Sequence, residues 1–172
     1  MHRRDLFKLT ATVPAFAAAS ASASAQTADK PATTWKPETL DAHQNETVIA
    51  LSDLIIPDTD TPGAKVAGVN RYIDLFLRDG STADRDRFVA GLGWLDGYAI
   101  QKHSNPFVRC SNAQQTAILT TLDEGLDASV AAGTAFFRIA KSMTSRIYYS
   151  TAIGFRELNK GGRVPRTFGC KV

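Results

Sequence analysis

Apolar side chains recur every three or four residues over residues 128–150, and this helical period constrains the fold more than any other feature of the chain. The apolar positions cover a wide arc of the expected helix: Val130, Phe136, Phe137, Ile139, Ala140, Met143, Ile147 and Tyr148. So wide an arc is typical of a central helix that neighbours cover on more than one side. We therefore expect a fold built around this segment.

Four earlier segments show the same period and predict helices over residues 39–56, 68–78, 81–102 and from Ser111 onward. Thr39 is expected to cap the first helix and Pro57 to end it, because proline cannot continue the helical hydrogen-bond ladder. Ser111 and Gln114 have the spacing of a capping box. No segment shows a convincing strand alternation. The sequence predicts an all-α fold, a single compact bundle of about five helices.

The two ends of the predicted domain differ from its helices in composition. Residues 26–38 are polar with two prolines and read as a linker, so the helical domain is expected over residues 39–172. Residues 161–170 (GGRVPRTFGC) are too rich in Gly and Pro for a helix. We expect them to form an irregular C-terminal arm.

Residues 1–25 have the organisation of an export signal: a basic start with Arg3 and Arg4, a mildly apolar middle and an Ala-Ser-Ala end at residues 23–25. The paired arginines resemble a twin-arginine signal, although His2 precedes the pair and Leu6-Phe7 inverts the usual order. The alternative is a short helix belonging to the fold, but its Ala- and Ser-rich sequence has no polar face. We expect export to the periplasm.

The net charge of +3 comes mostly from this signal. Residues 26–172 carry 17 basic and 16 acidic side chains, a net charge of +1, with no Lys/Arg cluster and no aromatic ladder. Nucleic-acid binding is therefore not expected.

Two cysteines, Cys110 and Cys170, occur in the chain. In an exported protein an even count permits a disulfide, and joining this pair would close a loop of about 60 residues worth roughly 4 kcal/mol. The bridge would also anchor the C-terminal arm. A bridge to another chain and two free thiols remain the alternatives.

Motifs for catalysis, cofactors and metals are missing or incomplete, so no catalytic, cofactor-binding or metal-binding residue is predicted on this chain. Gly91, Gly93 and Gly97 imitate a dinucleotide fingerprint, but the third glycine comes one position late and the segment is helical, which favours close helix packing. Asp58 and Asp60 imitate the start of a calcium loop that lacks its later ligands, so a plain turn is expected.

Several stretches together resemble one family. They are ALSDLIIP (residues 50–57), DTPGA (60–64), AGV (67–69), YID (72–74), GLGWLD (91–96), PF (106–107), QQ (114–115), FF (136–137), YYST (148–151) with Gly154, and GC (169–170). In order and spacing they resemble the small subunit (subunit 3) family of gluconate 2-dehydrogenase and related membrane-associated sugar dehydrogenases. The resemblance runs from about residue 40 to the end of the chain.

The resemblance implies a non-catalytic partner protein. In this family the flavin chemistry belongs to a large FAD-containing subunit of the glucose-methanol-choline type, and a multihaem cytochrome c subunit often takes the electrons. The small subunit assists folding, co-export and stability of the large one. The implied partners are thus the large subunit, a cytochrome c and the twin-arginine export machinery, in the periplasm or at the inner membrane through the complex.

For the partner-binding surface we hypothesise Tyr148, Tyr149 and Phe155 with Arg163 and Phe168 of the arm, because aromatic and Arg side chains are favoured interface anchors. The alternative, which the sequence supports as well, is that the two tyrosines complete the domain's own core. A different function is a stand-alone periplasmic helical ligand-binding protein, supported only by the Phe- and Tyr-rich segment 128–150. A stand-alone enzyme is disfavoured by the missing motifs.

Overall fold

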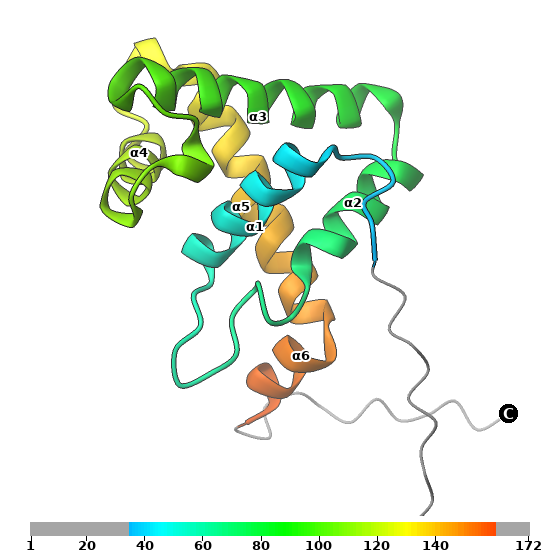
Figure 1. Cartoon of the computed structure of the whole chain (residues 1–172). Helices are drawn as coiled ribbons and strands as arrows, with labels where there is room; N and C mark the ends of the chain where they lie inside the picture. Colours follow the sequence, from blue (N-terminus) through cyan, green and yellow to red (C-terminus); the bar gives the residue numbers. More distant parts are fainter. Residues whose placement is uncertain (1–34, 161–172) are drawn as a thin grey trace, which may run out of the picture. The chain divides into compact units, whose positions relative to one another are not determined.

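The computed structural model describes residues 35–160, which form helices joined by turns and loops (Figure 1). The chain divides into two units, Met1–Trp35 and Lys36–Val172, and every described helix belongs to the second. The described elements are α1 (Ala42–Ile55), α2 (Val69–Asp79), α3 (Thr82–His103), the 3₁₀ turn η1 (Phe107–Arg109), α4 (Asn112–Glu124), the 3₁₀ turn η2 (Ala128–Val130), α5 (Ala131–Ser150) and α6 (Ala152–Asn159). Over residues 35–160 there is no strand, which confirms the all-α class. The predicted signal (1–25) and C-terminal arm lie outside the described residues.

The start of α1 differs from the prediction. Asp41, not Thr39, is the N-cap: its Oδ1 accepts from the backbone N–H of Gln44 at 2.8 Å, and Gln44 Oε1 accepts from the N–H of Asp41 at 3.0 Å. Thr39 lies two residues before this cap, and its backbone N–H donates to Asp74 Oδ1 of α2 at 3.0 Å. The local capping box of Asp41 and Gln44 thus marks where α1 begins, and a tertiary contact with α2 holds the residues that precede it.

The predicted starts of α3 and α4 are confirmed. The Ser81 hydroxyl accepts from the backbone N–H of Asp84 at 3.1 Å at the start of α3. Ser111 and Gln114 form the predicted capping box of α4. Local sequence is enough at these sites because each cap bonds only to its own first turn.

Helix α5 lies at the centre and packs against α1, α2, α3, α4 and α6, as its wide apolar arc predicts (Figure 1). Two glycines permit the close contact with α3. A Cβ added at Gly91 would lie 2.0 Å from Phe136 Cδ2, and one at Gly133 would lie 1.9 Å from Trp94 Cζ3. The expected close helix packing is thus found at Gly91, whereas Gly93 and Gly97 have no atom within 4 Å of an added Cβ.

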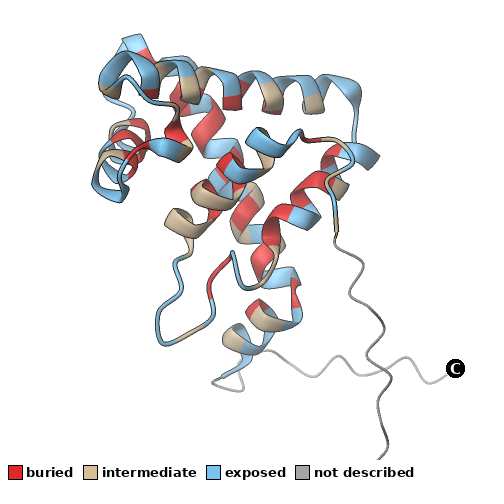
Figure 2. Ribbon diagram, viewed as in Figure 1, coloured by how far each residue is buried: buried red, intermediate tan, exposed pale blue. Residues whose placement is uncertain are grey.

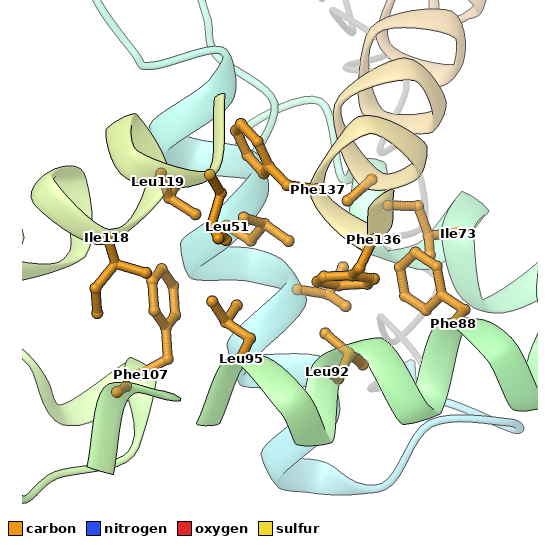
Figure 3. Packing of buried hydrophobic residues seen from close by; sticks show 14 of the residues in the cluster. Leu51, Ile73, Phe88, Leu92, Leu95, Phe107, Ile118, Leu119, Phe136 and Phe137 are labelled. Atoms are coloured by element: carbon orange, nitrogen blue, oxygen red, sulfur yellow. The ribbon is translucent and has the colours of Figure 1, made fainter. Parts of the chain in front are cut away.

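The buried apolar core residues come from α1 to α5, the two 3₁₀ turns and the segments beside them. Figure 2 shows the buried residues as separate patches along the ribbon. Phe136 points from α5 toward α3, where its ring meets the edge of Phe88 with centroids 5.4 Å apart (Figure 3). Phe107 of η1 is fully buried between α3 and α4, beside Leu95 and Ile118 (Figure 3). The apolar side of α3, which includes Phe88 and Leu95, faces this core.

The end of the bundle departs from the prediction in two ways. Residues 128–150 are not one helix, since η2 precedes α5, and a sixth helix, α6, follows where none is expected. Thr151 is extended (φ −76°, ψ 159°), which ends α5, and its hydroxyl oxygen accepts from the N–H of Gly154 at 3.1 Å and so caps α6. Helix α6 has only eight residues, too few for a clear apolar period.

Candidate functional site: a surface for a partner protein

Of the five residues predicted to bind a partner, Tyr148 proves to be a core residue. Its side chain is 3% exposed, and its hydroxyl donates to the carbonyl oxygen of Pro62 at 2.7 Å. The bond ties α5 to the connection between α1 and α2, 86 residues earlier. The prediction that Tyr148 faces a partner is corrected, because its ring and hydroxyl are both used inside the domain. Burial raises the pKa of this phenol, and the charge of Glu157 adds to the rise.

Tyr149 and Phe155 are on the surface, 43% and 49% exposed. The tight junction between α5 and α6 orients them. Gly154 is required there, since an added Cβ would lie 2.1 Å from the carbonyl oxygen of Tyr148. Whether Tyr149 and Phe155 contact a partner stays a prediction. The other two predicted residues, Arg163 and Phe168, lie outside the described residues.

The structure reveals an apolar groove between α2 and α5 that the sequence did not indicate as a surface. Its volume is about 400 Å³. Phe76 of α2, 48% exposed, forms one wall, and Ile139, Met143 and Ile147 of α5 form the other. Exposed apolar side chains that share a concave surface are typical of a binding site.

The α5 wall consists of two parallel rows of side chains at four-residue spacing. One row is apolar: Ile139, Met143 and Ile147. The neighbouring row is polar: Arg138, Ser142, Arg146 and Ser150. Both arginine side chains are exposed, and neither has a hydrogen bond or an ion pair with another residue between 35 and 160. The groove therefore combines an apolar row on its α5 wall with two arginine charges that have no partner among the described residues.

Sequence reasoning assigned these apolar residues correctly to helix faces but expected them to be covered. Phe76 belongs to the apolar face predicted for α2, and Ile139, Met143 and Ile147 to the wide arc predicted for α5. Periodicity places residues on one side of a helix, but not which part of that side a neighbour reaches. Two arginines, Arg138 and Arg146, border the apolar arc in the sequence, but that they have no partner was visible only in the structure.

A polar cluster joins α1, α3 and η1 on another part of the domain. His43 Nε2 lies 2.5 Å from Asp96 Oδ2, and Asp96 Oδ1 accepts from the backbone N–H of Phe107 at 2.9 Å. Gln115 in turn donates to the carbonyl oxygen of Phe107 at 2.8 Å. One oxygen of Asp96 thus ties α3 to α1 and the other holds η1 in place, which makes the cluster a structural junction.

Cys110 follows this junction and is buried, 8% exposed, with its thiol donating to the carbonyl oxygen of Asn105 at 3.6 Å. Burial raises the pKa of the Cys110 thiol, and the negative charge of Asp96 adds to the rise. Cys110 has no disulfide partner within the described range. Since Cys170 lies outside that range, the predicted bridge stays a prediction.

The calcium-like loop has the geometry of a turn. Asp58 Oδ1 accepts from the backbone N–H of Gly63 at 3.2 Å, and Asp60 Oδ1 accepts from the Thr59 hydroxyl at 3.0 Å. Among residues 35–160, no group of three or more His, Cys, Asp or Glu side chains is placed to hold a metal ion. None of the helices in that range has the length and apolar character to cross a membrane.

The fold and the groove define a small all-helical domain with an apolar, arginine-flanked surface. Residues 42–162 match the family model described as gluconate 2-dehydrogenase subunit 3. The chain belongs to this family, which is that of a small accessory subunit of a dehydrogenase complex. Neither the curated proteins nor the solved structures contain a significant match to the chain.

Proposed function

We propose that the chain is the non-catalytic small subunit of an exported FAD-dependent sugar or gluconate dehydrogenase. Its partner is a large flavoprotein subunit of the glucose-methanol-choline type, whose folding, co-export and stability it assists. The family match supports the accessory role, and the α2–α5 groove is the observation that carries the proposal of protein binding. FAD resides in the partner, and a cytochrome c subunit receives the electrons.

The alternative of a stand-alone ligand-binding protein finds little support in the packing. It relied on the aromatic residues of segment 128–150, yet Phe136 and Phe137 are each 5% exposed and belong to the core. Phe136 packs against Phe88 and covers Gly91, so its ring is used by the domain itself. The aromatic side chains near α5 that remain available, Phe76 and Tyr149, are on the surface.

Binding itself provides a mechanism for assistance. A subunit that binds only the folded large chain stabilises it by mass action, by about 2.7 kcal/mol at a concentration one hundred times Kd. The twin-arginine-type signal with Arg3 and Arg4 would then serve both chains, because that route carries folded proteins. The assembled complex would reside in the periplasm or at the periplasmic side of the inner membrane.

The test is production of the FAD-containing subunit in cells with and without this chain. We expect flavin-loaded enzyme in the periplasm only when both are present, and loss of export of both when Arg3 and Arg4 are replaced by lysine. The flavin content of the periplasmic fraction is the readout. Normal maturation of the flavoenzyme in cells that lack this chain, or oxidation of a sugar by this chain alone, would refute the proposal.

A further inference from the structure

We infer that the α2–α5 groove receives an amphipathic helix of the large subunit, whose apolar face packs on Ile139, Met143 and Ile147 and whose carboxylates pair with Arg138 and Arg146. This inference rests on the proposed function and names the surface and the partner's chemistry. It is carried by three features of the groove: its shape, its apolar row and its unpaired charges.

The shape of the wall fits a helix. Side chains at four-residue spacing form a ridge on a helix surface, and the ridge of a second helix packs beside it. Ile139, Met143 and Ile147 form such a ridge, and Phe76 closes the opposite side of the groove. Ser142, a small residue in the neighbouring row, leaves room between the arginines for a second backbone to approach, and Ser150 does so beyond Arg146.

The charges specify the occupant further. Arg138 and Arg146 are eight residues apart on α5, which corresponds to about 12 Å along the helix axis. A helix lying along α5 would present carboxylates at the same separation if they stood seven or eight residues apart, about two turns. Arg pairs with carboxylates through two parallel hydrogen bonds, which would fix the register of the partner helix along α5.

Charge also argues against this chain's own segments as the occupant. Residues 161–172 carry three basic side chains, Arg163, Arg166 and Lys171, and no acidic one. Residues 1–34 carry four basic and two acidic side chains. A second copy docked groove to groove would bring Arg138 and Arg146 against their own counterparts, because a two-fold interface pairs a surface with itself. An acidic helix of another protein is the occupant that the groove complements.

The first experiment measures the affinity of the full chain for the FAD-containing subunit. Reversal of one groove charge, Arg146→Glu, is expected to weaken binding about tenfold, and the double variant Arg138→Glu/Arg146→Glu more strongly, since each change sets a carboxylate against the partner's own. The matched control is Arg109→Glu, an exposed arginine of η1 outside the groove, which should change Kd less than about twofold.

Variants of an apolar side chain test the apolar row of the α5 wall with the same assay. Ile139→Asp places a charge on the ridge and should abolish detectable binding, whereas Ile100→Asp alters a side chain of similar exposure on α3 and should not. Circular dichroism and thermal unfolding of each variant show that it is folded. A folded Ile139→Asp variant that binds normally would overturn the inference.

A photoreactive amino acid in place of Ser142 identifies the occupant directly. We expect cross-links to one helix of the large subunit that carries two carboxylates seven or eight residues apart. Cross-links to residues 161–172, to a second copy of this chain or to a loop of the partner would refute the inference. So would binding to phosphatidylglycerol vesicles that Arg138→Glu/Arg146→Glu abolishes while flavoprotein binding persists.

The two proposals fail in different ways. If the unmodified chain does not bind the flavoprotein, the proposed function is wrong, and the groove inference, which rests on it, is wrong as well. If the unmodified chain binds and the groove variants bind equally well, only the groove assignment is wrong. If the control variants bind fully and the groove variants lose binding, both the proposed function and the groove inference are supported.

Discussion

Asp74 Oδ1 of α2 accepts a hydrogen bond from the backbone N–H of Leu40 at 2.9 Å, across 34 residues of chain. The same carboxylate accepts from the N–H groups of Glu38 (2.8 Å) and Thr39 (3.0 Å), while the Asp74 side chain is fully buried. One carboxylate thus accepts from three successive backbone N–H groups, and it holds in place the segment that leads into α1. This contact holds the residues that precede the capping box of α1 against α2.

Replacement of Asp74 by Ala should therefore lower the free energy of unfolding by about 2–4 kcal/mol, because it leaves buried backbone donors without an acceptor. Asp74→Asn keeps the shape but turns one acceptor into a donor, so it should also destabilise. The measurement is urea unfolding followed by circular dichroism. A matched surface change, Asp53→Asn on α1, should have little effect, and equal stability of the Asp74 and Asp53 variants would contradict the role of Asp74.

Two neighbouring glycines of α3 should respond oppositely to the same substitution. Gly91→Ala forces a Cβ to within 2.0 Å of Phe136 Cδ2 and should cost about 1–3 kcal/mol of stability through overpacking. Gly93→Ala meets no atom within 4 Å and should stabilise by up to about 1 kcal/mol, because alanine favours helix more than glycine does. Thermal unfolding of the two variants decides, and a stabilising Gly91→Ala would disprove the close contact of α3 with α5.

The buried phenol of Tyr148 should make stability depend on pH in the alkaline range. Since its pKa is raised in the folded state, the folded state holds this proton more tightly than the unfolded state does. Its contribution is then complete below the ordinary tyrosine pKa of about 10 and is lost as the pH rises above it. Above pH 10, the free energy of unfolding of Tyr148→Phe should fall less steeply with rising pH than that of the control Tyr149→Phe, whose ring is 43% exposed. Identical pH profiles of the two variants would contradict this expectation.

If Cys110 and Cys170 form the predicted bridge in the exported protein, Cys110→Ala and Cys170→Ala should each lower stability by about 4 kcal/mol. The double variant should lose little more than either single variant, since one bond is broken in all three. Addition of a reductant should remove the differences between the unmodified chain and the variants. Denaturant unfolding with and without reductant is the measurement, and additive losses, or dimers on a non-reducing gel, would rule out the intramolecular bridge.

Local sequence predicted most of the described helices because the deciding interactions lie within a few residues. The capping box at Ser111 and Gln114 and the cap at Ser81 are satisfied inside their own first turns. Pro57 likewise ends α1 near residue 56 by its own chemistry. The start of α1 was placed two residues too early, because the prediction took Thr39 as the cap and not the local capping box of Asp41 and Gln44. The existence of α6 was missed, since it depends on the cap of Thr151 over a short helix.

By itself, the sequence determined the all-α class, the position of most described helices, which side of them is apolar and, through its ordered motifs, the family. Only the tertiary structure decided which apolar residues remain uncovered. Tyr148 and Ile147 are neighbours on the same helix, yet Tyr148 is buried against Pro62 while Ile147 lines the open groove beside Phe76. Helical period reports chemistry along one segment, whereas coverage depends on where the other helices pack, so the candidate binding surface could be recognised only once α2 and α5 were placed together.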